Sequence, residues 1–273
     1  MRMTRALLPV LLAAASSLAL ASQASATQAQ AAGKYVALGD SYAVAVGTRS
    51  YDNPDDACRR GPLAYTRLYA AAHPEKAFVE ASCSGATTAD IPGQLAQVTP
   101  NTTLVTLQVG GNDVGFVDVL TNCILTIDDA ACVNGVELAK AAATSQLSPA
   151  LGTLYAQVRA AAPNAQIIVV GYPRLYKIGG NCGIFGLSDT ERTALNSASD
   201  TLAGIMSQRA AAAGLTFLDV RPLFDPHAIC AGGTTWVTSL EWDKINESYH
   251  PNTAGHQGIF QAINGMAARA AQA

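Results

Sequence analysis

The stretch "KYVALGDSYAVAVGTRS", residues 34–50, joins a short apolar run to the tripeptide Gly39-Asp40-Ser41. The apolar residues 35–38 are typical of a buried strand, and the abrupt end of that strand leaves a serine at the edge of a sheet. Small residues follow Ser41 in place of an ordinary polar turn. A serine hydroxyl is a poor nucleophile until a base removes its proton. The meaning of the stretch therefore depends on the partners that distant parts of the chain bring to Ser41.

Apolar runs like this one recur between segments with helical patterns. We expect strands at residues 35–39, 77–81, 103–109, 166–173 and 215–220, and helices at 62–72, 89–98, 138–162, 188–213 and 253–271. Ser188 followed by Glu191 predicts a capping box at the start of one helix, and Pro149 is a candidate break in another. Strands that alternate with helices predict an α/β fold with a five-stranded parallel sheet covered on both faces.

The first residues resemble a targeting signal. Two arginines precede an apolar stretch at residues 6–21, and "ASA" at 24–26 is typical of a cleavage site. The pattern predicts a signal peptide over residues 1–26, cut between 26 and 32, because the apolar run is short for a membrane anchor and is interrupted by Pro9. Residues 33–273 would then form a single secreted, extracellular domain with no later membrane-spanning segment.

Charge and cysteine content limit the partners and the compartment. The chain carries 17 basic and 20 acidic residues without a basic cluster, so nucleic acid and anionic membranes are poor candidates. Six cysteines in a secreted chain predict three disulfides. Several connectivities are possible. We expect sequential pairing, because each pair then closes one loop-rich region: Cys58–Cys83, Cys123–Cys132 and Cys182–Cys230.

The spacing of these cysteines and of the histidines gives no sign of a metal site. No C-x-x-C or H-x-x-x-H spacing occurs, so we expect no metal, and nothing in the chain requires a cofactor. A monomer is the default expectation for the oligomeric state.

Three polar segments directly follow predicted strands: residues 39–41, 82–85 and 110–113. Because the carboxyl ends of parallel strands meet at one edge of a sheet, we expect these segments to lie together. A histidine is the usual base for a serine. His250 lies in "NESYHPNTAGH", just ahead of the last predicted helix, and can face this edge. The other three histidines are more simply explained as a helix-end residue (His73), a loop residue (His227) and a packed helical residue (His256).

Four short motifs occur in a fixed order: "GDSY" at 39–42, the glycine of "CSGATT" at 83–88, "GGND" at 110–113 and "HPN" at 250–252. Each is weak alone, but together they are specific. With them the chain resembles the SGNH hydrolases, also called the GDSL lipase/esterase family, and is most similar to its secreted actinobacterial lipases, esterases and phospholipases A1. The resemblance covers essentially all of residues 33–273 and implies a flavodoxin-like, three-layer α/β/α fold.

The resemblance also implies roles for individual residues. Ser41 would be the nucleophile and His250 its general base and acid. The oxyanion hole would comprise the backbone N–H groups of Ser41 and Gly85 and the side-chain amide of Asn112. These assignments are chemically sensible, because glycine allows close approach of its amide and asparagine donates hydrogen bonds without a charge. The small residues 43–45 after Ser41 would leave room for substrate and make the adjacent wall apolar.

The third member of the catalytic triad has two candidates. The family commonly has an aspartate three residues before the histidine, where this chain has Glu247. Glutamate is one methylene longer, and some secreted actinobacterial relatives instead use a main-chain carbonyl two residues before the histidine. We therefore favour the carbonyl of Ser248 over the carboxylate of Glu247.

The resemblance implies a serine carboxylic-ester hydrolase that cleaves acyl esters of lipids through an acyl-enzyme, as a lipase, phospholipase A1 or esterase. A carbohydrate acetyl esterase is the alternative, although an aromatic content of 6% disfavours an extended sugar-stacking groove. A non-catalytic binding module that retained the fold is the third hypothesis. No G-x-S-x-G occurs, so the α/β-hydrolase nucleophile elbow is not the scaffold.

Overall fold

The computed structural model describes residues 33–126, 128–182 and 186–270. The predicted signal peptide lies outside these residues. Among the helices of the described ranges, none combines the length and the apolar character needed to cross a bilayer.

The sheet has five parallel strands in the order β2-β1-β3-β4-β5. The strands are β1 (Lys34–Gly39), β2 (Ala77–Glu80), β3 (Thr102–Gln108), β4 (Gln166–Val170) and β5 (Thr216–Leu218). This is the strand order of flavodoxin-like, doubly wound sheets, which bind ligands beyond the carboxyl ends of the strands. The five-stranded parallel α/β fold predicted from the sequence is thereby confirmed.

Alternate residues of the strands face opposite layers of helices. On β1, Tyr35 and Ala37 belong to a buried cluster with residues of α1 (Tyr65–Ala72) and α8 (Thr253–Ala270). Val36 and Leu38 belong to a second cluster, packed with α2 (Ile91–Leu95), α5 (Ser148–Ala161) and the C-terminal half of α6 (Asp189–Ala212). Both faces of the sheet are therefore covered by helices and buried, which explains why the strand sequences are continuous apolar runs.

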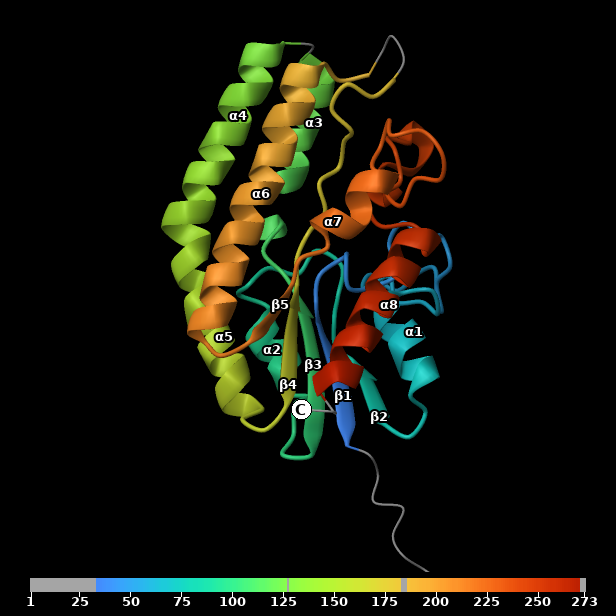
Figure 1. Cartoon of the computed structure of the whole chain (residues 1–273), viewed down its shortest axis with the longest axis vertical. Coiled ribbons are helices and arrows are strands. Elements are labelled where there is room, and N and C mark those ends of the chain that lie inside the picture. The colour runs from blue at the N-terminus through green and yellow to red at the C-terminus, as the bar shows by residue number, and fades with distance from the viewer. Residues whose placement is uncertain (1–32, 127, 183–185, 271–273) are drawn as a thin grey trace, which may run out of the picture. The chain divides into compact units, whose positions relative to one another are not determined.

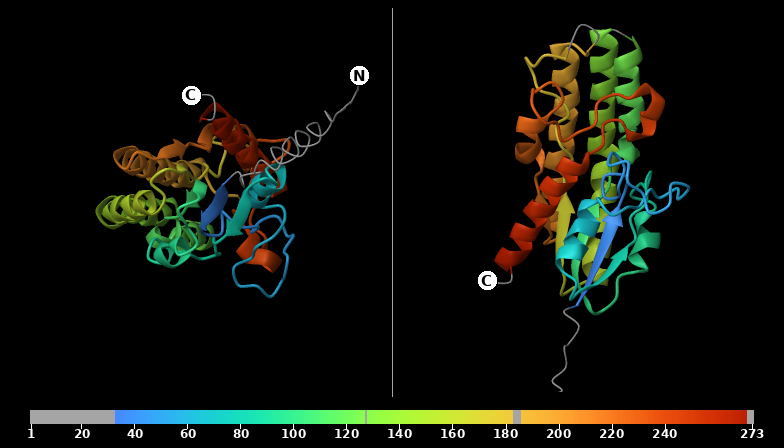
Figure 2. Two further views of the ribbon diagram at one scale, coloured as in Figure 1. Left: turned by 90° about the horizontal axis from the view of Figure 1, so that it is seen from below. Right: turned by 90° about the vertical axis from the view of Figure 1, so that its right-hand side faces the viewer.

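Three helices extend past the carboxyl ends of the strands: α3 (Phe116–Thr126), α4 (Asp129–Ala142) and the N-terminal half of α6 (Figures 1 and 2). The sequence prediction placed no helix at 116–126 and began the next one at residue 138, so it was wrong here. Asp128 caps α4 by accepting hydrogen bonds from the N–H groups of Ala130 and Ala131, which allows the helix to begin nine residues earlier than expected.

Pro149 does not break the helix that follows. The chain passes from α4 through a π-helical turn (η2, Ala143–Leu147) directly into α5, with Pro149 in the first turn of α5. A proline is tolerated there because the N–H groups of a first turn have no partner inside their own helix. The capping box of α6 is present as predicted: Ser188 Oγ accepts from the Glu191 N–H at 3.1 Å, and the Glu191 carboxylate accepts from the Ser188 N–H at 2.8 Å.

Three disulfides tie the loops and helices around the carboxyl edge of the sheet. They join Cys58 to Cys83, Cys123 to Cys132 and Cys182 to Cys230, the pairs expected from the sequence. The first links the long loop after Ser41 to the segment that contains Gly85, and the second links α3 to α4. Each bridge stabilises the fold by about 2–4 kcal/mol through the restriction of the unfolded chain.

The remaining elements are short. They are α7 (Arg221–Phe224) and three 3₁₀ turns, η1 (Asn112–Val114), η3 (Asp225–His227) and η4 (Trp242–Glu247). Two of them, η1 and η4, flank the carboxyl edge where the predicted catalytic residues lie.

Candidate active site

Ser41 and His250 meet at the carboxyl edge of the sheet. Ser41 follows β1 by two residues, and His250 lies between η4 and α8. The hydroxyl Oγ of Ser41 lies 2.8 Å from Nε2 of His250, although 209 positions separate the two residues. Their contact is a hydrogen bond of the length that proton transfer requires.

The other ring nitrogen of His250 is held by main chain. Nδ1 lies 2.9 Å from the carbonyl oxygen of Ser248, which can only accept a hydrogen bond. Nδ1 therefore carries the proton, and Nε2 presents a lone pair to the Ser41 hydroxyl. This is the tautomer that a general base needs.

The carboxylate of Glu247 has other partners. It accepts hydrogen bonds from the N–H of Gly47, at 2.8 Å, and from the hydroxyl of Tyr51. Both donors belong to the loop that follows Ser41. Glu247 therefore ties the loop that follows Ser41 to the loop that contains His250, while the carbonyl of its neighbour Ser248 contacts the imidazole.

Replacing Glu247 with alanine should lower kcat/KM by less than about tenfold, because the Ser248 carbonyl stays in place. Loss of a triad carboxylate in a comparable hydrolase costs on the order of 10⁴-fold. The free energy of unfolding should fall by about 1–2 kcal/mol, since Gly47 and Tyr51 lose their acceptor. Glu247→Gln, which keeps an acceptor oxygen, is the control for stability. A thousandfold loss of kcat/KM in the alanine variant would assign the third position to the carboxylate instead.

Desolvation sets the protonation state of His250. Burial lowers its pKa to about 4, while the hydrogen bond to Ser248 and the charge of Glu247 act in the opposite direction. A lowered pKa means that the imidazole is neutral at pH 7. It is then free to accept a proton from Ser41.

Asp40 organises the turn that presents Ser41. Its side chain is 2% exposed and accepts hydrogen bonds from the N–H of Tyr42, at 2.9 Å, and from the hydroxyl of Tyr172. Burial raises its pKa to about 7. The hydroxyl of Tyr172 also accepts from the N–H of Gly111, at 3.4 Å, so it links the Ser41 turn to the segment after β3.

The sequence analysis missed Tyr172 and the role of Tyr42. Tyr42 donates a hydrogen bond to the carbonyl of Tyr249 and packs its ring against that of His250, with 5.0 Å between ring centres. Tyr172 lies two residues beyond Val170, the last residue of β4, at the same edge as the three polar segments. The sequence "VVGYP" at 169–173 was therefore an available signal.

The residues after Ser41 correct another expectation. Residues 41–49 form successive turns, and Ala43, Val44 and Ala45 are fully buried. They pack into the core, so they neither make room for substrate nor form its wall. The pocket wall beside Ser41 is instead formed by Tyr42 and Val46.

The residues of the predicted oxyanion hole, Gly85 and Asn112, line the same pocket as Ser41. Gly85 has a φ of 82°, a conformation that side chains with a Cβ rarely adopt. One N–H of the Asn112 side chain donates to the carbonyl of Ala86 at 2.9 Å, which holds the amide beside Gly85 and leaves its second N–H for a ligand. Within the described part of the chain, the amide N–H groups of Ser41 and Gly85 donate a hydrogen bond to no protein acceptor.

The remaining histidines have structural surroundings. His73 stacks on Tyr69, His227 stacks on Trp236, and the buried ring of His256 accepts a hydrogen bond from the N–H of Tyr65. Across residues 33–126, 128–182 and 186–270, no three histidine, cysteine or acidic side chains are grouped so that they could hold a metal ion.

Ser41 and His250 open into a pocket of about 500 Å³. Gly85 and Asn112 lie on its wall with them, together with Tyr172. The volume falls within the range of about 300–1,000 Å³ that small-molecule sites occupy. The pocket thus brings a serine, a neutral histidine and three donors together around a space for a ligand.

Comparisons with known proteins show what this chain is similar to. The model of the GDSL-like Lipase/Acylhydrolase family matches residues 37–257. Over 94% of its length, the chain is 44% identical to "Lipase 1" of Streptomyces coelicolor, of which the match covers 96%. Among solved structures, phospholipase A1 from Streptomyces albidoflavus NA297 is 46% identical, with a TM-score of 0.81 over 85% of this chain and 98% of that one. An extracellular lipase from Streptomyces rimosus is 39% identical, with a TM-score of 0.81 over 85% and 99%.

Proposed function

Because this chain belongs to the GDSL-like Lipase/Acylhydrolase family, we propose that it hydrolyses acyl esters of lipids with Ser41 as nucleophile and His250 as its base. The chain is a carboxylic ester hydrolase, as its family and its lipase relatives indicate. The observation that carries the assignment of the nucleophile is the 2.8 Å contact between Ser41 Oγ and His250 Nε2.

The first half of the proposed reaction forms an acyl-enzyme. Ser41 Oγ bonds to the carbonyl carbon of the ester while its proton passes to Nε2 of His250. The carbonyl oxygen becomes an oxyanion that accepts hydrogen bonds from Ser41, Gly85 and Asn112, each worth about 3–4 kcal/mol in the transition state. The imidazolium then gives its proton to the alcohol oxygen as the bond between carbon and that oxygen breaks.

The second half releases the acid. Water attacks the acyl-enzyme, its proton passes to Nε2, and the same proton returns to Ser41 Oγ as the bond between carbon and Oγ breaks. The Ser248 carbonyl holds the ring in one tautomer throughout. Since a neutral carbonyl stabilises an imidazolium less than a carboxylate would, the donors of the oxyanion hole carry a larger share of the rate enhancement.

We also propose that the protein is secreted. The signal-like residues 1–26 and three disulfides both fit an oxidising, extracellular compartment. The relative from Streptomyces rimosus is described as an extracellular lipase.

Lipid esters are favoured over the alternatives. The relatives with substantial identity are named as lipases and a phospholipase A1, which supports a lipid substrate over an acetylated carbohydrate. A non-catalytic binding module has no use for a proton-transfer pair, so the contact between Ser41 and His250 disfavours that hypothesis.

A panel of esters tests the proposed substrate class. Triolein, phosphatidylcholine and p-nitrophenyl butyrate should be hydrolysed, because the catalytic pair opens into a largely apolar pocket, whereas acetylated xylan should give little or no acetate. Release of fatty acid or p-nitrophenol at constant pH is the measurement. Faster turnover of acetylated xylan than of every lipid ester would support the carbohydrate esterase, and inactivity on the whole panel would support the binding module.

A further inference from the structure

The pocket that contains Ser41 and His250 continues between the helices beyond the sheet. On its helical side it is lined by apolar residues of α3, α4, η2 and α6 (Phe116, Val119, Leu120, Ile124, Ala139, Ala143, Leu195, Ala198 and Leu202). We call the space between these nine side chains the helical channel. Leu175, Leu240 and Tyr249 line the same pocket from outside these helices.

The channel follows one face of α6. Leu195, Ala198 and Leu202 are spaced by three and four residues, so their side chains lie on the same face. With a rise of about 1.5 Å per residue, this stretch of α6 is about 10 Å long. On α3, Phe116 to Ile124 cover a similar length.

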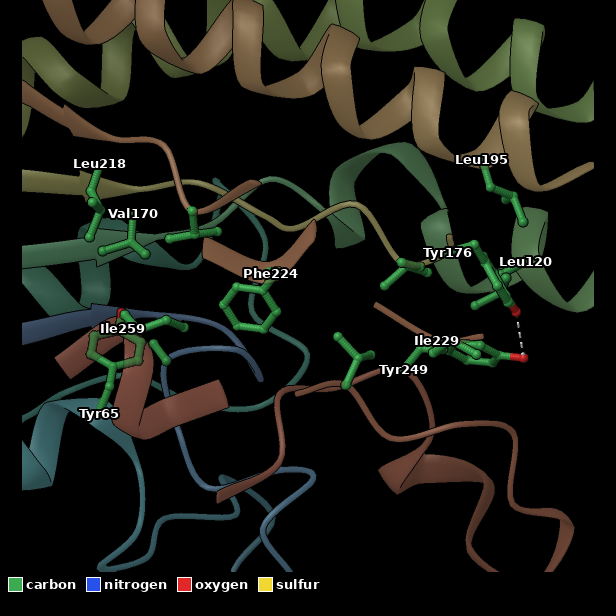
Figure 3. Packing of buried hydrophobic residues seen from close by; sticks show 14 of the residues in the cluster. Tyr65, Leu120, Val170, Tyr176, Leu195, Leu218, Phe224, Ile229, Tyr249 and Ile259 are labelled. Atoms are coloured by element: carbon green, nitrogen blue, oxygen red, sulfur yellow. Dashed lines mark hydrogen bonds between the residues drawn. The ribbon is translucent and has the colours of Figure 1, made fainter. Parts of the chain in front are cut away.

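The channel leads away from the catalytic edge. Leu202 lies close to Gly110, which comes two residues after the end of β3 and two residues before Asn112, the first residue of η1. Leu195 belongs to the other end, where Figure 3 draws it near Leu120 and Tyr176, far from Val170 of the sheet. Ala198 thus lies between the catalytic end and the distal end.

The walls of the channel suit a hydrocarbon chain. Ala139 of α4 and Ala143, the first residue of η2, are one turn apart and put two small side chains on the wall, and Ala198 adds a third from α6. Larger side chains at these positions would fill the space. Lys140, which also lines the pocket, pairs through Nζ with Glu137 at 2.8 Å, so its charge is compensated.

We propose that the helical channel binds the acyl chain of the ester, and that Ala139 and Ala198 determine the length of chain that fits. This inference rests on the proposed function, since it takes the ester carbonyl to lie at Ser41. An extended polypeptide advances about 3.6 Å per residue, or about 1.2 Å for each of the three backbone bonds, and we use the same advance per bond for an extended acyl chain. A channel of about 10 Å therefore holds about eight carbons, which points to acyl groups of medium length or longer.

The test compares kcat/KM for p-nitrophenyl dodecanoate with kcat/KM for p-nitrophenyl butyrate. Ala198→Phe should lower this ratio, because the ring would block the distal half of the channel. Each methylene excluded from an apolar site costs about fourfold. The distal half of a channel for about eight carbons holds about four methylenes, and exclusion of only three of them lowers the ratio by about 60-fold. Ala198→Leu should lower it less, and Ala139→Phe should reproduce the effect from the opposite wall.

Matched controls come from the same helices. Ala141 of α4 and Ala211 of α6 are exposed and do not line the pocket. In Ala141→Phe and Ala211→Phe, the ratio of the two kcat/KM values should be the same as in the parent protein. Thermal unfolding of every variant shows which ones are folded. If Ala198→Phe disturbs the packing of the protein, the smaller substitution Ala198→Leu still tests the proposal.

Two results separate this inference from the proposed function. If the folded Ala198 and Ala139 variants keep the parent's ratio within about twofold, where about 60-fold is expected from the excluded methylenes, the channel does not bind the acyl chain. Serine catalysis would then still stand. If Ser41→Ala remains active, the proposed nucleophile is wrong, whatever the chain-length profile.

Discussion

Replacing Ser41 with alanine should lower kcat for p-nitrophenyl butyrate by about 10⁴–10⁶-fold, the range spanned by removal of one catalytic residue from a serine hydrolase. The substitution deletes the oxygen that lies 2.8 Å from His250 and would form the acyl-enzyme. The backbone N–H of residue 41 remains, and so do Gly85 and Asn112. Residual activity therefore comes from binding and from the oxyanion hole.

The fold should tolerate this change. The turn around Ser41 is held by Asp40, which accepts hydrogen bonds from Tyr42 and Tyr172 and does not depend on the serine hydroxyl. We expect the same circular dichroism and a melting temperature within a few degrees of the parent's. Ser145→Ala, which removes an exposed hydroxyl from η2, is the matched control and should retain full activity. Activity of Ser41→Ala within about tenfold of the parent would reject the serine mechanism.

The sheet was predictable because its strands carry a strong local signal. Residues 35–38, 104–107 and 167–170 are runs of apolar, often β-branched residues that end in glycine or a polar residue. Burial on both faces requires this composition, and turn residues mark the ends. The order of the strands was not predicted, since nothing in a single strand specifies its neighbour.

The helices beyond the sheet were harder to predict. The segment "FVDVLTNCILT" of α3 contains several β-branched residues and lacks a clear polar face, so its pattern does not distinguish a helix from a strand. It is helical because α4 packs on it and Cys123 is bonded to Cys132. Tertiary contacts of this kind override local propensity.

Within the site, the sequence indicated which residues lie close together better than it indicated where their side chains point. The order of the motifs selects four residues, Ser41, Gly85, Asn112 and His250. It does not determine the orientation of their side chains. Whether Glu247 would point to the imidazole or to Gly47 depends on the backbone of η4, and the burial of Ala43 depends on how the turn after β1 packs. Such choices are set by a few dihedral angles that neighbouring elements impose.

Replacing His250 with alanine should reduce kcat about as much as the loss of Ser41, by about 10⁴–10⁶-fold at pH 7. The substitution removes the base, and an unassisted serine hydroxyl is almost fully protonated at that pH. His227→Ala is the matched control, because that ring stacks on Trp236 away from Ser41 and should be dispensable for catalysis. Wild-type turnover by His250→Ala would require another base.

The pH dependence of the parent protein gives an independent check on His250. The imidazole must be neutral to accept a proton, so kcat/KM should fall as the pH decreases through its pKa of about 4. Between pH 4 and neutral pH, His250 should stay neutral and able to accept a proton, whereas a solvent-exposed histidine with a pKa near 6.5 would become protonated in this range. The residual activity of His250→Ala should lack this inflection over the range in which circular dichroism shows a folded protein. An inflection near 6.5 that persists in Asp40→Asn, which removes the carboxyl group with a pKa of about 7, would mean that the imidazole is solvated in the free enzyme.

Combining Ser41→Ala with His250→Ala distinguishes a catalytic pair from two independent contributions. If the imidazole acts only through the serine hydroxyl, its loss has no further consequence once that hydroxyl is gone. The double variant should then retain about the same residual kcat as either single variant, as found when catalytic residues act as a unit. Additive losses would mean that His250 also assists direct attack by water, a route that needs no acyl-enzyme. Equal residual rates in all three variants would therefore support proton transfer from Ser41 Oγ to His250 Nε2 as the step that both residues serve.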